Sequence, residues 1–193
     1  MSVPALGFKN FKDLAAARIE GIDYHIHVQR TPGSSVAVIA PHGGRIEPHT
    51  SAIAREVAGT DFNLYLFEGI RQQGNYAALH LTSHRFDEPR CLDLLSYCDY
   101  VVAIHGCRGA TQKVLLGGLD QRLKDAAAQA IADRGIEVVR DGHPFPATEA
   151  SNICNRGRQA IGLQVEISSA LRGSGARHEL CTAIRAMLLR VQA

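Results

Sequence analysis

Residues 35–47 run Ser35-Val-Ala-Val-Ile-Ala-Pro-His-Gly-Gly-Arg-Ile-Glu47, an apolar stretch that passes directly into glycines and polar side chains. The first six residues are continuous and apolar, which is typical of a strand covered on both faces of a sheet. We therefore predict a strand over 35–40 that Pro41 ends. In α/β folds, ligands bind just beyond such strand ends, so this stretch predicts both a sheet and a functional edge.

Strands and helices alternate along the rest of the chain. Apolar runs predict further strands over 62–67, 77–81, 100–104, 114–116, 136–139 and 161–165. Apolar residues at helical spacing predict helices over 50–59, 91–98, 119–134 and 176–192, the first of them capped by Thr50 or Ser51. No internal repeat or linker divides the chain, so we expect one α/β domain over residues 1–193.

The composition excludes several classes of protein. Of the 193 residues, 46% are hydrophobic and 21% are charged, which excludes a disordered or coiled-coil chain. No apolar run approaches the roughly 18–20 residues of a membrane span, so no membrane partner is expected. The net charge of +2 is too small for a typical nucleic-acid surface, so no nucleic-acid partner is expected either.

The cysteines favour a reducing compartment. There are five, an odd number, and none forms a C-x-x-C pair. The first residues show no basic stub followed by an apolar core, as a secretory signal would. We therefore expect reduced thiols and a cytoplasmic protein. Its oligomeric state does not follow from these features.

Three of the apolar strands are followed by side chains that can bind metals. His42 and Glu47 follow the first strand, His105 follows the strand at 100–104, and Glu166 follows the last strand. Ligands of an open α/β sheet bind outside the carboxyl ends of its strands. We therefore expect these four side chains to meet, although they lie far apart in the sequence.

Two imidazoles and one carboxylate form the usual ligand set of a catalytic zinc ion, which keeps a water molecule as its fourth ligand. Gly43 and Gly44 allow the sharp turn that would bring His42 and Glu47 to one ion. Such an ion lowers the pKa of its bound water and polarises a carbonyl group. Glu166 would then act as the general base.

Simpler interpretations of these residues stay open. A histidine after a strand is often an ordinary loop residue, and Glu47 could be a first-turn acid that the helix dipole favours. Glu166 is harder to explain in this way, because a carboxylate within an apolar run needs a partner. Cys107 could be a nucleophile only with an oriented base, for which no local pattern exists, and a small buried residue is the alternative.

Two further segments are rich in polar residues. Asn155 and Arg156, followed by a glycine, could bind a carboxylate with two hydrogen bonds. A surface loop with a helix cap is the alternative. In the segment 82–89, Asp87 and Glu88 are interpreted as ordinary loop acids.

Several motifs in combination resemble the poly-γ-glutamate hydrolase family, whose best-known members come from bacteriophages of encapsulated bacilli. They are A-P-H-G-G-R-I-E at 40–47, F-E-G at 67–69, G-N at 74–75, L-H-L-T-S at 79–83, F-D-E-P at 86–89, I-H-G-C at 104–107 and G-L-Q-V-E-I at 162–167. The resemblance extends from about residue 20 to the C-terminus. It implies a zinc-carboxypeptidase-like α/β fold with a mixed, mostly parallel sheet flanked by helices.

The resemblance also implies roles for individual residues. Zinc (Zn²⁺) would be bound by His42, Glu47 and His105, and Glu166 would be the catalytic glutamate. The reaction implied is hydrolysis of γ-glutamyl amide bonds, with poly-γ-glutamate as the substrate.

A substrate-binding pair is implied by a related family. Zinc carboxypeptidases hold the substrate carboxylate with an Asn-Arg pair, to which Asn155 and Arg156 are similar. Arg108 and Arg172 are rival cations for this role. The roles of His80 and His84 are left open.

Two other functions are weighed against this one. A zinc peptidase or an N-acyl amino acid amidohydrolase would use the same metal ligands on a small acidic amide. A non-catalytic, phage-related accessory protein would need no turnover and could contact DNA, although no DNA-binding motif is present. If the protein derives from a phage, we expect its release from the cytoplasm on lysis.

Overall fold

The computed structural model describes residues 7–192, so the expected domain limits at residues 1 and 193 lie outside the described residues. The strands are β1 (Tyr24–Gln29), β2 (Val36–Gly44), β3 (Asn63–Gly69), β4 (Tyr100–Cys107), β5 (Lys113–Gly117), β6 (Glu137–Val139) and β7 (Leu163–Ser168). The α-helices are α1 (Phe11–Ala17), α2 (Thr50–Ala58), α3 (Asn75–Leu79), α4 (Pro89–Leu95), α5 (Gln121–Ala132), α6 (Ser169–Arg172) and α7 (Arg177–Gln192). Two short 3-10 helices are η1 (Ser83–Arg85) and η2 (Ile153–Asn155).

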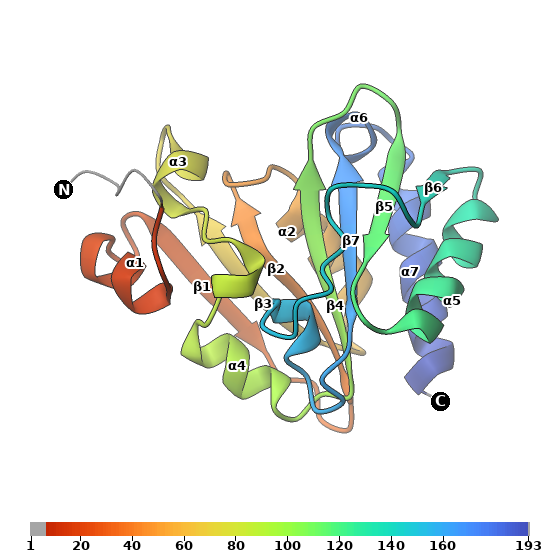
Figure 1. Ribbon diagram of the computed structural model, residues 1–193, viewed down its shortest axis with the longest axis horizontal. Coiled ribbons are helices and arrows are strands. Elements are labelled where there is room, and N and C mark those ends of the chain that lie inside the picture. Colours follow the sequence, from red (N-terminus) through yellow and green to blue (C-terminus); the bar gives the residue numbers. More distant parts are fainter. Residues whose placement is uncertain (1–6, 193) are drawn as a thin grey trace.

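The strands form one seven-stranded sheet in the order β1-β3-β2-β4-β7-β5-β6 (Figure 1). The pairs β3–β2, β2–β4, β4–β7 and β5–β6 are parallel, whereas β1–β3 and β7–β5 are antiparallel. The expected mixed, mostly parallel sheet is therefore confirmed. Because β3, β2, β4 and β7 run in the same direction, their carboxyl ends lie along one edge of the sheet.

The two faces of the sheet pack against different helices. On β2, Val36, Val38 and Ala40 pack in a core with α2, α5 and α7. Their neighbours Ala37 and Ile39 pack in a second core with α1, α3 and α4. This separation follows from the alternation of side chains along a strand. Figure 1 shows α5 and α7 side by side at the right and α4 at the lower left.

Most of the elements expected from the sequence are present. The helices expected over 50–59, 91–98, 119–134 and 176–192 are α2, α4, α5 and α7, with shifts of a few residues at their ends. All five cysteines are buried and unpaired, in agreement with reduced thiols. Among residues 7–192, each helix is too short or too polar to cross a lipid bilayer.

The strand expected over 77–81 is wrong, because residues 75–79 form helix α3. Alanine favours a helix over a strand, and two alanines stand in this short run. The helix buries Ala78 and Leu79 and leaves Tyr76 exposed. It ends at His80, whose backbone is extended.

The cap expected for α2 is also wrong. The residue at the cap position is His49, and its side chain makes no capping hydrogen bond. The Thr50 hydroxyl instead donates to the Glu47 carbonyl over 2.7 Å. The Ser51 hydroxyl accepts a hydrogen bond from the Gly44 backbone N–H over 2.8 Å. Both side chains thus attach the start of the helix to the turn before it.

Pro41 does not end β2, which continues to Gly44. Between Ala40 and Gly43 the register against β3 shifts, because this part of β2 contains one residue more than the paired segment of β3. Proline is tolerated at such a bulge, where the missing N–H removes no ladder hydrogen bond. The extra residue reverses the alternation of side chains, so His42 lies on the same face as Ile39.

Candidate active site

The turn after β2 brings His42 and Glu47 together. Gly44 has a φ of 62°, and a Cβ at this position would lie 2.5 Å from the carbonyl oxygen of Gly69. Only glycine fits a backbone that is both left-handed and this close to a neighbouring strand. The Glu47 N–H donates to the His42 carbonyl over 2.9 Å. The Glu47 carboxylate consequently lies 3.1 Å from Nδ1 of His42.

His105 and Glu166 are direct neighbours across two parallel strands. In the register of β4 against β7, their Cα atoms are paired. The residues before and after Glu166, Val165 and Ile167, belong to the core formed with α2, α5 and α7. By alternation, Glu166 points to the opposite face, where His105 also lies.

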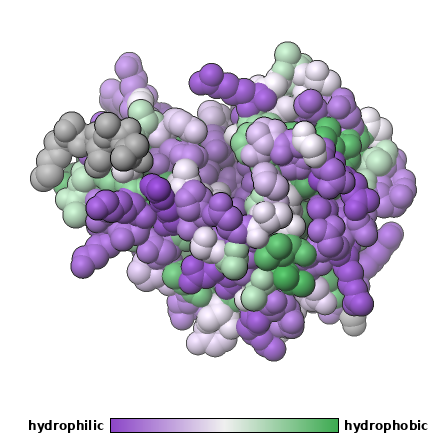
Figure 2. Space-filling model, viewed as in Figure 1, coloured by the Kyte–Doolittle hydropathy of each residue, from purple (hydrophilic) through white to green (hydrophobic). Residues whose placement is uncertain are grey.

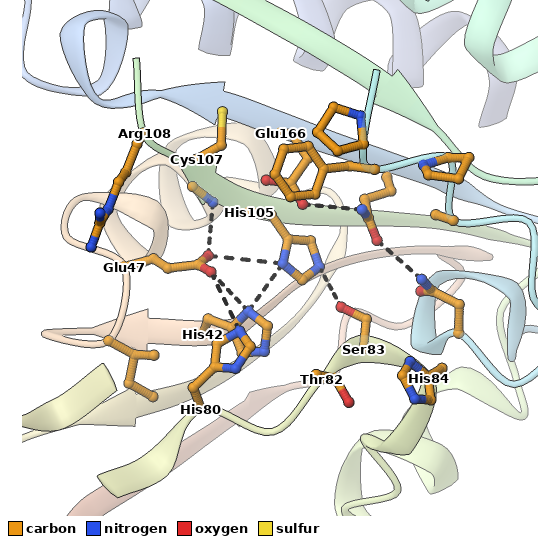
Figure 3. A pocket seen from close by; sticks show the side chains of 18 of the residues that line it. His42, Glu47, His80, Thr82, Ser83, His84, His105, Cys107, Arg108 and Glu166 are labelled. Carbon is orange, nitrogen blue, oxygen red and sulfur yellow. Dashed lines mark hydrogen bonds and ion pairs between the residues drawn. The ribbon is translucent and has the colours of Figure 1, made fainter. Parts of the chain in front are cut away.

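These four side chains converge at the carboxyl edge of the sheet (Figure 3). Nδ1 of His105 lies 3.1 Å from Nδ1 of His42 and 3.8 Å from the Glu47 carboxylate. The Glu47 carboxylate also accepts a hydrogen bond from the Gly106 N–H over 2.7 Å. None of the four residues is more than 9% exposed. The meeting of His42, Glu47, His105 and Glu166 expected from the strand ends is therefore observed.

The donor set fits a bound metal ion. Nε2 of His42 lies 2.8 Å from the Leu81 carbonyl, which can only accept, so this nitrogen carries the proton and Nδ1 is free to bind a cation. Metal-binding histidines commonly donate their other N–H to a carbonyl in this way. His105 likewise turns Nδ1 to the cluster and Nε2 to the Ser83 hydroxyl, 3.5 Å away. Two imidazole nitrogens and a carboxylate within 4 Å are the chemistry that zinc prefers.

Glu47, His42 and His105 lie so close together that each charge shifts the pKa of its neighbours. Burial raises the pKa of Glu47, but the charge and hydrogen bond of His42, the charge of His105 and the Gly106 N–H together outweigh burial and lower it to about 2. Burial lowers the pKa of His42, but the charge and hydrogen bond of Glu47, the Leu81 carbonyl and the charge of Glu166 together outweigh burial, so the net shift is upward. Burial, and then the positive charge of His42, lower the pKa of His105 to about 3. The ionised Glu47 carboxylate therefore stabilises a positive charge placed next to it.

Glu166 is held by a chain of side-chain amides. Gln164, two residues earlier on the same face of β7, donates through Nε2 to the Glu166 carboxylate over 3.0 Å. Asn152 in turn donates to the Gln164 carbonyl oxygen over 3.2 Å. Burial, and then the charge of Glu47, raise the pKa of Glu166 to about 8. The carboxyl group is therefore oriented and can hold a proton near neutral pH.

A pocket of about 940 Å³ opens over the cluster. Its volume is in the range of small-ligand sites. Besides the four converging side chains, its lining includes His80, His84, Cys107, Arg108, Gln164, Arg172 and the segment 144–149. Figure 2 shows that hydrophilic residues dominate this side of the molecule and that hydrophobic residues form separate patches.

His80 is a member of the site for which the sequence reasoning found no role. Its ring lies between those of His42 and Tyr76, with centroid distances of 4.2 Å and 4.4 Å. Its Nε2 lies 4.0 Å from the Glu47 carboxylate, and the ligand atoms of His42, Glu47 and His80 lie within 4.8 Å of one another. The signal in the sequence was the L-H-L-T-S segment, but a strand expected there gave no direction for the ring.

The structure does not bring Asn155 and Arg156 to the pocket lining. The Asn155 amide donates to the carbonyls of Ala147 and Glu149, each over 2.9 Å, and its oxygen accepts from the Leu119 N–H. It thus connects three backbone segments, and Arg156 is exposed to solvent. Their expected role in substrate binding stays a prediction that this geometry does not support.

The two loop acids have structural partners. Asp87 accepts a hydrogen bond from the Phe11 N–H. Glu88 caps helix α4 by accepting from the Cys91 N–H over 2.9 Å, and it pairs with Arg90. Glu88 is thus a buried helix cap rather than a loop acid, and neither residue lines the pocket.

Comparison with known proteins places the chain in a family. Residues 8–182 match the poly-gamma-glutamate hydrolase family. Two proteins of Bacillus subtilis (strain 168) are related in sequence. UPF0714 protein YndL is 34% identical over 86% of this chain and 66% of its own length. UPF0714 protein YmaC is 35% identical over 86% of this chain and 70% of its own length. The chain thus spans about two thirds of these relatives.

Two solved structures have the same fold over nearly the whole chain. A bacteriophage poly-gamma-glutamate hydrolase superposes with a TM-score of 0.90 at 30% identity, over 95% of this chain and 97% of that protein. YndL in a zinc-free apo form superposes with a TM-score of 0.88 at 30% identity, over 95% and 98% of the two chains. Together with the match over residues 8–182, these similarities show that the chain belongs to the poly-γ-glutamate hydrolase family.

Proposed function

We propose that this chain hydrolyses the γ-glutamyl amide bonds of poly-γ-glutamate, with one zinc ion bound by His42, Glu47 and His105 and with Glu166 as the general base. The observation that carries the proposal is the convergence of these four side chains in one pocket. Membership of the family supports the substrate class. The zinc-free form described for YndL supports the choice of metal.

In this mechanism, each group in the pocket has a separate role in hydrolysis. Bound zinc would supply a Lewis acid for the amide carbonyl and lower the pKa of a water molecule. Glu166 accepts a proton from the attacking water as the new C–O bond forms. It then donates this proton to the amide nitrogen as the C–N bond breaks, which leaves one carboxylate and one amine. The Gln164 amide occupies one oxygen of Glu166 and leaves the other for the proton.

The walls of the pocket suit an acidic substrate. Every residue of poly-γ-glutamate carries a free carboxylate, so cations near the reacting bond assist its capture. Arg108 and Arg172 line the pocket. The small net charge of +2 is therefore compatible with a polyanionic substrate, because two arginines line the pocket.

The proposal is tested by measuring zinc content and hydrolysis on the same preparations. Wild type should bind about one zinc ion per chain and shorten poly-γ-glutamate, as followed by gel filtration. His42→Ala should lose both the metal and the activity, because it removes a ligand. Glu166→Gln should keep the metal and lose the activity.

Two results would contradict the proposal. One is wild type that takes up no zinc on reconstitution although it is folded. The other is zinc-loaded wild type that cleaves short N-acylglutamates but not the polymer, which would favour the small-substrate amidohydrolase. Glu137→Gln, an exposed change on the edge strand β6 and outside the pocket lining, is the matched control and should behave as wild type.

A further inference from the structure

Arg172 is a buried cation without a counter-ion. It is the last residue of α6, it lines the pocket, and it is 7% exposed. Nε and Nη1 of its guanidinium group have no hydrogen-bond partner within the described part of the chain. Nη2 has one long hydrogen bond of 3.5 Å to the Cys107 carbonyl. Among residues 7–192, no carboxylate lies within ion-pair distance of it.

A charge buried in this way is unfavourable unless something else pairs with it. Removing a charged group from water costs several kcal/mol in real proteins, and the cost is recovered only when its hydrogen bonds are satisfied. The nearby carboxylates are engaged elsewhere: Glu47 with His42 and the Gly106 N–H, and Glu166 with Gln164. The partner that Arg172 lacks is therefore an anion that enters the pocket.

The backbone next to the cluster is shaped around this side chain. The guanidinium group lies against Gly106, the residue between His105 and Cys107. A Cβ at Gly106 would lie 1.3 Å from Nη1 of Arg172, so any other residue would displace the arginine. The charge is thus held one residue away from a proposed zinc ligand, at the wall of the same pocket.

We propose that Arg172 binds the free α-carboxylate of the glutamate residue on the leaving side of the scissile γ-amide. This inference rests on the proposed function. The guanidinium fork matches a carboxylate with two parallel hydrogen bonds, which an ammonium group cannot do. In a γ-linked chain, the leaving nitrogen and this carboxylate are attached to the same carbon. Arg172 and Glu166 line the same pocket, so one can hold the carboxylate while the other protonates the nitrogen.

The experiment compares two substrates that differ only in this group. One is a γ-glutamyl-glutamate dipeptide, and the other has the leaving-side α-carboxylate replaced by a carboxamide. Wild type should prefer the carboxylate in kcat/KM by about 10- to 100-fold, the range for hydrogen bonds to charged groups. Arg172→Gln should lose this preference by losing activity on the carboxylate alone. Arg172→Lys, which retains the charge, should lose part of it.

Arg108→Gln is the matched control, because Arg108 lines the same pocket but is exposed. It should lower kcat/KM for both substrates by a shared small factor and keep the preference. An equal loss on both substrates in Arg172→Gln and Arg172→Lys would overturn the proposal and assign Arg172 to general electrostatics or to folding.

Binding of glutarate to the metal-free protein provides a readout without turnover. Calorimetry should show at least a tenfold weaker affinity in Arg172→Gln than in wild type. Equal affinity, or no binding by either protein, contradicts the proposal. If wild type hydrolyses neither dipeptide nor the polymer, the proposed function fails, and the glutarate titration still decides whether Arg172 binds a carboxylate.

Discussion

The two faces of β7 differ in what they contribute. Leu163, Val165 and Ile167 point into the core with α2, α5 and α7 and are fully buried. Gln164 and Glu166, which alternate with them, are also buried but lie on the face of the pocket. One strand therefore carries an apolar face that fixes its position and a polar face that supplies the chemistry.

The two faces also differ in how well their side chains are satisfied by their surroundings. Side chains on the apolar face need no hydrogen-bond partner, and burying them away from water is favourable in itself. On the polar face, Glu166 has a pKa raised to about 8 by burial and by Glu47, and Arg172 has unpaired donors. Substitutions on the apolar face should therefore reduce stability, whereas substitutions on the polar face should reduce activity.

The largest effect is expected on the polar face. Glu166→Gln keeps the shape of the side chain and removes the proton acceptor, so turnover should fall by about 10²- to 10⁴-fold. Stability should not fall, because a buried carboxylate is replaced by a neutral amide. Initial rates and thermal melts on zinc-loaded protein measure both quantities. Activity near that of wild type would remove Glu166 from the role of base.

A substitution on the apolar face of the sheet should reduce stability and leave turnover nearly unchanged. Ile104 precedes His105 on β4 and is fully buried in the core with α2, α5 and α7. Ile104→Ala should lower the free energy of unfolding by about 2–5 kcal/mol, because it removes buried methyl groups and leaves a cavity. Denaturant titration measures this loss. Turnover per folded molecule should change little, and a loss comparable to that of Glu166→Gln would mean that the two faces are not independent.

The stability of the protein should also depend on pH through the titratable groups of the polar face. The Glu166 carboxyl has a pKa of about 8 in the folded protein against an ordinary value of 4.5, so the folded state binds the extra proton. Stability from this group is present at low pH and is lost as the pH rises from 4.5 through about 8. The low pKa of His105, about 3 against an ordinary 6.5, acts oppositely but only below pH 6.5.

The metal-free protein should therefore lose up to about 2 kcal/mol from Glu166 between pH 6.5 and 8, the amount that one proton contributes over that interval. Denaturant titrations across this range measure the slope, and Glu166→Gln should reduce it. Part of the slope should persist, because the raised pKa of His42 acts in the same direction. An unchanged slope in Glu166→Gln would show that its carboxyl group has an ordinary pKa. Glu137→Gln should run parallel to wild type.

The smallest effect is expected at Arg156, outside the pocket. Arg156→Gln should leave kcat/KM within about twofold and stability within about 0.5 kcal/mol, as for ordinary surface changes. Its buried neighbour offers a contrast: Asn155→Ala should destabilise by about 1–3 kcal/mol, since it leaves backbone groups without partners. A large loss of activity in Arg156→Gln would restore the substrate-binding pair expected from the sequence.

The sequence by itself determined the α/β class, most of the strands and helices, and the identity of the converging residues. Continuous apolar runs are buried wherever they occur, and the side chain that follows a parallel strand must lie at its carboxyl edge. For this reason His42, His105 and Glu166 could be placed at one edge before any contact was known.

Only the tertiary structure decided which neighbours complete the site. The bulge at Pro41 depends on the register against β3, and it places His42 on the same face of the sheet as His105. The stacking of His80 requires that residues 75–79 be helical. The unpaired state of Arg172 depends on which acceptors lie within a few ångströms. Register, side-chain direction and pairing are long-range properties, and no local pattern of residues fixes them.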